Sequence, residues 1–240
     1  MNDKKIMLIG LDMSFNSTGI SMAIMEHNIT RKIKFYRVVF DDESNKTHKI
    51  LKPQDIQNVN QIVYRMPSNI NVLDLAIDIE DKNSYEQIRN TLRAMICSKK
   101  INSIIANNIV AEEPDIIICT MENYIMPSFG GRNSLNNVSG LLLLQGFVRE
   151  WFIKYSVSYE NINTYLFTPT PKQTKKYFTG NGSADKKEMQ QYFIENFDGQ
   201  KLLPNMSKGK LDDVIDSFAL MVHGWNKYLN LVENDSNIRK

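Results

Sequence analysis

The sequence predicts an α/β fold in which helices flank a β-sheet. Three strand-like segments stand near the start of the chain, at residues 5–14, 20–25 and 33–40, and short turn-like stretches separate them. A further segment, residues 115–122, is almost wholly apolar, which is typical of a strand covered on both faces. Apolar residues recur at helical spacing before and after that segment, so helices are expected to cover the sheet.

Length and composition are those of an ordinary globular protein. The chain has 240 residues with 29 Lys and Arg against 27 Asp and Glu, a formal net charge of +2, so the placement of the basic residues matters more than their total. No apolar run reaches the roughly 18 residues that span a bilayer, and the N-terminus does not read as a signal peptide. We therefore expect a cytoplasmic protein without a membrane partner. Cys97 and Cys119 lack metal-ligand spacing and are predicted to be buried free thiols.

We predict a single domain over residues 1–232 with a C-terminal tail at 233–240. The first three strands are expected to run antiparallel in succession. Residues 41–82 lose clear periodicity and are interpreted as an insertion after the third strand, with a short hairpin at 62–65.

Two long helices and a last strand are predicted next. The first helix covers about 84–111, with a break near Lys99 left open, and the second covers about 133–155. Gly140 within the second helix indicates close approach of another backbone, for example that of a partner subunit. The last strand is expected at 162–167.

The remaining chain is predicted to return to helix after an extended stretch. Pro169 and Pro171 favour extended backbone before a lysine-rich segment. Ser183 suits the N-cap of the next helix, with Asp185 in its first turn. The final helix is predicted over about 211–232.

Four acidic residues carry the chemical argument. Asp12 closes the first strand and Glu122 closes the apolar strand, and a buried carboxylate is tolerated only with a partner. Asp213 and Asp216 stand three residues apart, so their carboxylates lie on one face of the final helix. Such a cluster suits Mg²⁺ or Mn²⁺, and two such ions roughly 3.5–4 Å apart promote phosphodiester hydrolysis. The structural alternative is that the two helix acids favour the helix N-terminus while Asp12 bonds its own turn.

At these residues the sequence resembles the RuvC family of Holliday junction resolvases, within the ribonuclease H-like superfamily. The resemblance rests on four modest motifs in the same order as in the family, at residues 10–14 with Thr18 and Gly19, 121–123, 172–173 with 180–186, and 210–219.

The resemblance implies a ribonuclease H-like fold with a mixed five-stranded sheet and a homodimer with two active sites. It also implies a metal-dependent endonuclease that resolves Holliday junctions or related branched DNA, with four-way DNA as partner. By position, the metal ligands for two Mg²⁺ ions, with Mn²⁺ as substitute, would be Asp12, Glu122, Asp213 and Asp216. Lys172 and Lys186 would meet the scissile phosphate. Asp212 stays as an alternative ligand to Asp213.

Basic and aromatic residues around these motifs are expected to contact DNA. Phosphate contacts of this kind supply affinity without reading sequence. The expected set is Tyr124, Phe129, Arg132, Lys172, Gln173, Lys175, Lys176, Ser183, Lys186, Lys187 and Lys210. The bacterial enzymes carry an aromatic residue three positions after the glutamate, where this chain has Ile125, so Tyr124 or Phe129 would serve as the wedge at the junction. A solvated lysine face is the structural alternative.

Two other classes remain open from the sequence. A catalytically inactive module that binds branched DNA would bind four-way DNA without cutting it. An ATPase of the actin and sugar-kinase group also has an Asp followed by Ser, Thr and Gly in its first hairpin, and would turn over ATP without DNA. The divergent loops and single-domain build are compatible with a viral version of the nuclease, which would act in the host-cell cytoplasm.

Overall fold

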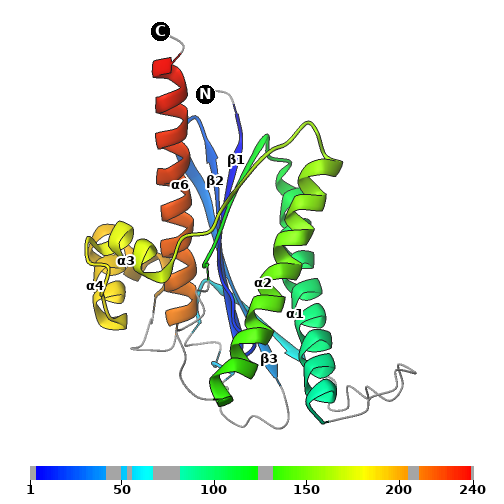
Figure 1. The fold of residues 1–240 in the computed structure, drawn as a ribbon. Helices are drawn as coiled ribbons and strands as arrows, with labels where there is room; N and C mark the ends of the chain where they lie inside the picture. Colours follow the sequence, from blue (N-terminus) through cyan, green and yellow to red (C-terminus); the bar gives the residue numbers. More distant parts are fainter. Residues whose placement is uncertain are drawn as a thin grey trace.

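The computed structural model describes residues 4–41, 50–52, 56–66, 82–123, 132–204 and 211–238. A mixed β-sheet forms the centre and helices cover both of its faces (Figure 1), so the predicted α/β class with a mixed sheet flanked by helices is confirmed. In sheet order the strands are β4 (Val59–Arg65), β3 (Ile29–Asp41), β2 (Ser17–Glu26), β1 (Ile6–Asp12), β5 (Ile116–Met121) and β6 (Asn163–Phe167).

The central strand is β1. It pairs antiparallel with β2 and parallel with β5, and β2 pairs antiparallel with β3, so the predicted meander of three strands is confirmed. The predicted hairpin at 62–65 is wrong, because β4 pairs in parallel with β3. The described sheet therefore has six strands in place of five, and part of the predicted insertion forms one edge of it.

Helices α1 (Lys82–Glu112) and α2 (Arg132–Ser158) cover one face of the sheet, and α6 (Asp212–Ile238) covers the other (Figure 1). No break interrupts α1 at Lys99, because Cys97 and Ile101 are buried on either side of it while Lys99 itself faces solvent. The final helix continues to Ile238, beyond the end predicted at residue 232.

Side chains of β1 alternate between two hydrophobic cores, as the two-residue period of a strand requires. Met7, Ile9 and Leu11 belong to the core that also contains residues of α1 and α2. Ile6 and Leu8 belong to the core shared with α6. Even-numbered positions of β1 therefore face α6.

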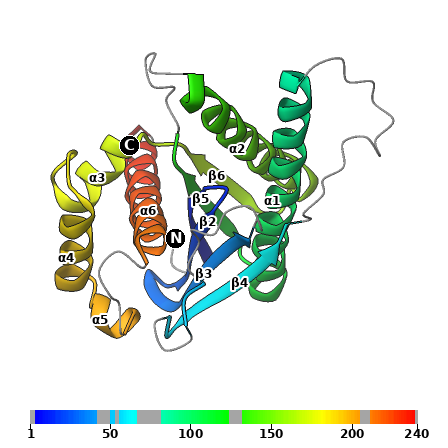
Figure 2. The same cartoon turned by 90° about the horizontal axis from the view of Figure 1, so that it is seen from below.

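Three short helices, α3 (Pro171–Thr179), α4 (Lys186–Asn196) and α5 (Gly199–Leu202), lie beside α6 (Figure 2). Thr170 has the extended backbone expected before the lysine-rich segment, with φ −73° and ψ 158°, but Pro171 already begins α3. Thr170 caps its first turn reciprocally with Gln173, and proline is well suited to the first helical position. The N-cap of α4 is Asp185 rather than Ser183, because the Asp185 carboxylate accepts two backbone N–H groups of the first turn.

Other packing predictions have mixed outcomes. Gly140 makes room for the ring of Phe15 of the same chain, since a Cβ there would lie 2.6 Å from Phe15 Cε2. The close approach is therefore to a side chain, and the predicted approach of a backbone is wrong. Cys97 and Cys119 are buried free thiols, as predicted. Among the described helices, none has the length and apolarity needed to cross a bilayer.

Candidate active site

Asp12 and Glu122 lie side by side at the carboxyl ends of neighbouring strands. β1 and β5 run parallel, and their last register pair is Leu11 with Met121. Asp12 directly follows Leu11, and Glu122 directly follows Met121. Because neighbouring backbones in a sheet lie about 5 Å apart, the two acids are close to each other. Leu11 and Met121 are buried against the α1 and α2 side, so alternation turns both acids toward the face that α6 covers.

Two glycines allow α6 to lie directly on this end of the sheet. A Cβ at Gly10 would be 1.9 Å from the carbonyl oxygen of Ser217, and a Cβ at Gly19 would be 1.9 Å from that of Asp213. No side chain fits at such distances, so glycine is required at both positions. Gly19 pairs with Asp12 across β1 and β2, and the first turn of α6 therefore rests beside Asp12.

A buried pair of hydroxyls fixes α6 against β2. The Oγ atoms of Ser21 and Ser217 lie 2.7 Å apart, and Ser217 Oγ also donates to the carbonyl of Val214 at 2.8 Å. Buried hydroxyls need such partners, so this contact favours one rotation of the helix about its axis. Ser217, which this contact fixes, directly follows Asp216 in the chain.

The charges of the other three predicted acids all act on Asp12. We call these four residues the acidic cluster: Asp12, Glu122, Asp213 and Asp216. Burial raises the pKa of the Asp12 carboxyl well above its usual value, and the charges of Asp216, Glu122 and Asp213 raise it further. The structure thus brings together, at one end of the sheet, four acids from three elements far apart in sequence.

Burial and mutual repulsion also raise the pKa values of other members. The pKa of Glu122 rises from 4.5 to about 7, first through burial and then through the charge of Asp216. The pKa of Asp216 rises from 3.8 to about 6, first through burial and then through the charge of Asp212. Lys175 lowers both values and Lys186 lowers that of Asp216, so two lysines partly compensate the cluster.

Two acids at the start of α6 each have a cationic partner. Arg37 Nε donates to Asp213 Oδ2 at 2.9 Å, and the backbone N–H of Val214 donates to Asp213 Oδ1 at 2.9 Å. Lys186 Nζ donates to Asp212 Oδ2 at 2.8 Å. The sequence left Asp212 and Asp213 as alternative metal ligands. Each of the two carboxylates already forms an ion pair with a basic side chain.

The donor set of the acidic cluster fits a hard divalent cation. Its members offer only carboxylate oxygens, which magnesium and manganese accept. The pKa values of Asp12, Glu122 and Asp216 are raised first by burial and then by neighbouring acids, and a bound cation would offset both effects. Across the described ranges, however, no three Asp, Glu, His or Cys side chains are already grouped closely enough to hold an ion. Binding would therefore require the carboxylates to draw together.

The lysines expected at the scissile phosphate lie on α3 and α4. Lys186 reaches the start of α6 through Asp212, while Lys172 packs beside Gly182, where a Cβ would lie 2.9 Å from Lys172 Cγ. Lys175, expected only to contact DNA, lies near the cluster, since its charge lowers the pKa of Glu122. Its Nζ also donates to the carbonyl of Ala184 at 2.8 Å, which ties α3 to the loop before α4.

Other residues of the expected DNA-binding set have varied positions. Gln173 Oε1 accepts the backbone N–H of Thr170 at 2.9 Å, so this side chain caps α3. Ser183 and Lys176 are exposed.

The remaining members of the expected set cannot be placed. Arg132 is the first residue of α2, and its side chain lies outside the described part of the structure. Tyr124, Phe129 and Lys210 lie outside the described residues altogether.

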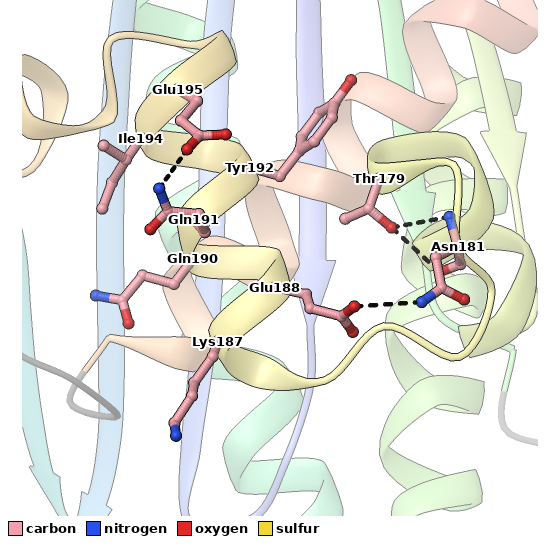
Figure 3. Close-up of a pocket in the computed structure, with 9 residues that line it drawn as sticks. All are labelled: Thr179, Asn181, Lys187, Glu188, Gln190, Gln191, Tyr192, Ile194 and Glu195. Carbon is pink, nitrogen blue, oxygen red and sulfur yellow. Dashed lines mark hydrogen bonds between the residues drawn. The ribbon is translucent and has the colours of Figure 1, made fainter.

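An open cavity of about 650 Å³ lies along α4 and the end of α3 (Figure 3). Lys187 lines it together with Glu188 and Glu195, and no member of the acidic cluster lines it. The cavity therefore does not belong to the site formed by the acids.

Two residues that contact the acidic cluster, Arg37 and Gln145, were not predicted from the sequence. Arg37 interrupts the apolar end of β3, and Gln145 interrupts the apolar run of α2. Gln145 is buried and its Nε2 donates to the carbonyl of Glu122 at 2.9 Å, which holds the backbone of the acid in place. A buried polar residue inside an apolar run is a signal that could have identified both.

The raised pKa of Glu122 predicts that the metal-free protein loses stability as the pH rises. Glu122 titrates at about 4.5 when unfolded and at about 7 when folded, so the folded state binds more protons between these values and its stability falls across that window. We expect Glu122→Gln to stabilise the metal-free protein by about 3 kcal/mol at pH 8 and to have little effect at pH 4.

Chemical denaturation in the presence of a chelator, at both pH values, measures this difference. Glu160→Gln serves as the control, because Glu160 is exposed outside the site and its substitution should change neither value. If the Glu122→Gln protein is no more stable than the wild type at pH 8, the Glu122 carboxylate is not destabilised by burial and by the charge of Asp216, and the prediction is wrong.

Comparison with known proteins finds similar solved structures only. No family model and no curated protein matches the sequence. The chain is similar to Thermus thermophilus RuvC, with 11% identity, a TM-score of 0.44, and coverage of 93% of this chain and 96% of that one. It is similar to T. thermophilus RuvC in complex with Holliday junction substrate, with 11% identity, a TM-score of 0.45, and coverage of 95% and 96%. It is also similar to the yeast mitochondrial Holliday junction resolvase Ydc2, with 14% identity, a TM-score of 0.47, and coverage of 99% and 83%.

Proposed function

We propose that this protein is a metal-dependent endonuclease that cleaves branched DNA, with the four-way junction as its preferred substrate. The observation that carries the proposal is the convergence of the acidic cluster from β1, β5 and α6 at one end of the sheet. A structural role explains one acid at a strand end, but it does not explain why burial and repulsion are tolerated at Asp12, Glu122 and Asp216 together.

The acidic cluster would hold the cation. Asp12, Glu122 and Asp216 offer carboxylates whose raised pKa values a positive charge would lower, and Asp213 stands beside them with Arg37. A pair of magnesium ions held there would supply an activated water and would stabilise the leaving oxygen of an in-line phosphodiester displacement.

Basic residues beside the cluster would bind and orient the DNA backbone. The side chain of Lys186 is 75% exposed although its Nζ reaches Asp212, so the ammonium can turn toward a phosphate at the same place. Lys175 lies near Glu122 and Asp216 and compensates charge within the site. Because contacts of this kind release counterions, we expect junction binding to weaken steeply as salt rises.

A homodimer would place two such sites on the symmetric arms of one junction. Ile153 and Val157 are one helical turn apart on α2 and are 59% and 73% exposed, which is consistent with an apolar contact on this helix. Light scattering of the purified protein should give the mass of two chains, and the mass of one chain at assay concentrations would contradict the dimer.

Cleavage of defined DNA substrates tests the proposed function. Labelled four-way, flap and linear duplex DNA are incubated with the protein, with magnesium or with a chelator. We expect paired nicks in the four-way DNA with magnesium alone, and little cutting of the linear duplex. Tight binding of four-way DNA without cutting in magnesium or manganese would overturn the nuclease and favour an inactive binding module.

A further inference from the structure

A single row of residues crosses four strands at the level of the acidic cluster. Asp12 pairs with Gly19, Gly19 with Arg37, and Arg37 with Gln61. Paired positions point to the same face of a sheet, and Phe35 and Val59, two residues before Arg37 and Gln61, belong to the core under α6. The row therefore runs along the face on which α6 rests, from the edge strand β4 to Asp12.

The space above Gly19 is taken by the first turn of α6. Asp213 lies there, with its carbonyl oxygen 1.9 Å from where a Cβ of Gly19 would be. Arg37, the next residue of the row, binds the Asp213 carboxylate at 2.9 Å, and the two side chains are only 10% and 12% exposed. The guanidinium thus holds Asp213 from the side opposite Asp12.

Arg37 is itself held from the edge strand. Its Nη1 donates to Gln61 Oε1 at 3.2 Å. The same Oε1 accepts the backbone N–H of Leu51 at 3.1 Å, and Gln61 Nε2 donates to the Leu51 carbonyl at 3.0 Å. Gln61 Oε1 therefore accepts two hydrogen bonds and Nε2 donates one. Two parts of the predicted insertion, Leu51 and β4, thus fix the guanidinium.

We propose that Arg37 is a positioning residue that orients Asp213 toward the cation site, and that the insertion is part of the scaffold of that site through Gln61. The inference rests on the proposed function, because it assigns Arg37 a role in the binding of the divalent cation. Hydrogen bonds to ligating carboxylates commonly orient them, and their loss weakens metal binding about 10-fold to 100-fold.

The sign of the effect distinguishes positioning from charge. If Arg37 acted only through its positive charge, its removal would make the site more negative and would tighten cation binding. If Arg37 orients Asp213, its removal weakens cation binding in spite of the charge. A lysine at this position keeps the charge but lacks the planar fork that spans Asp213 and Gln61, so it should not restore affinity.

Titration calorimetry with Mn²⁺ alone measures the affinity without relying on activity. We expect Arg37→Gln and Arg37→Lys each to weaken Mn²⁺ binding about tenfold and to slow junction cleavage, with junction binding in a chelator unchanged. Arg31→Gln is the matched control, because Arg31 lies on the same strand, is exposed and pairs with Glu26. Affinity equal to or tighter than that of the wild type in Arg37→Gln would overturn the proposal.

Two further variants keep the test decisive. Arg37→Gln in an Asp213→Asn background should weaken Mn²⁺ binding no further, because the two residues act as one unit. If Arg37→Gln does not fold, as judged by thermal unfolding, Gln61→Ala decides: a loss of Mn²⁺ affinity of about threefold or more supports the proposal and an unchanged affinity overturns it. A wild-type protein that neither binds Mn²⁺ nor cuts junctions would instead refute the proposed function, and this inference with it.

Discussion

Asp12→Asn is expected to lower junction cleavage by at least about a thousandfold while leaving junction binding unchanged. Asparagine keeps the shape of the side chain but removes one negative charge from the centre of the acidic cluster, where Asp12 feels the charges of the other three acids. Single-turnover cleavage in magnesium measures the loss of rate, and gel-shift binding in a chelator measures DNA affinity. Because the removed carboxylate is buried among like charges, the metal-free variant should also be more stable at pH 8.

Asp198→Asn provides the matched control. Asp198 is exposed at the start of α5, makes no capping bond through its side chain, and has a φ of 51°, which asparagine tolerates. Its substitution should leave cleavage unchanged. An Asp12→Asn protein that cuts as fast as this control would remove the case for a carboxylate-held cation.

Gly19→Ala is expected to destabilise the protein by at least about 3 kcal/mol and to abolish cleavage. The new Cβ would lie 1.9 Å from the carbonyl oxygen and 2.4 Å from the carbonyl carbon of Asp213, and backbone of a packed helix cannot yield as a flexible side chain does. The first turn of α6 must move away from β2, which separates Asp213 and Asp216 from Asp12. Thermal unfolding should show a loss of about 10 °C for a chain of this size.

Gly146→Ala on α2 is the control for this substitution. A Cβ at Gly146 meets nothing within 4 Å, so alanine should leave the protein as stable as before or stabilise it by up to about 1 kcal/mol through helix propensity. Equal stability of Gly19→Ala and Gly146→Ala would contradict the direct packing of α6 on the sheet that assembles the site.

The acids of the site could be predicted from sequence because each stands at a local boundary. Asp12 and Glu122 end apolar runs, and Asp213 and Asp216 open an amphipathic helix, so local patterns were sufficient. The meander of β1 to β3 was predictable for the same reason, since short turns join consecutive antiparallel strands.

The parts that were missed depend on contacts between distant residues or on competing local signals. The parallel pairing of β4 with β3 has no short-range signature, and the ion pair of Arg37 with Asp213 joins residues 176 positions apart. Pro169 and Pro171 were both expected to favour extended backbone, but Pro171 starts α3 together with Thr170 and Gln173. Ser183 and Asp185 are both suitable N-cap residues for α4. Only the backbone conformation shows that Asp185 caps the helix.

Diffraction from crystals soaked in Mn²⁺, collected at a wavelength where manganese scatters anomalously, tests the central claim most directly. The account predicts an anomalous peak between the carboxylates of Asp12, Glu122, Asp213 and Asp216, with Asp213 still bound to Arg37. Saturating Mn²⁺ without a peak among these acids, or with a peak only elsewhere on the protein, would contradict it.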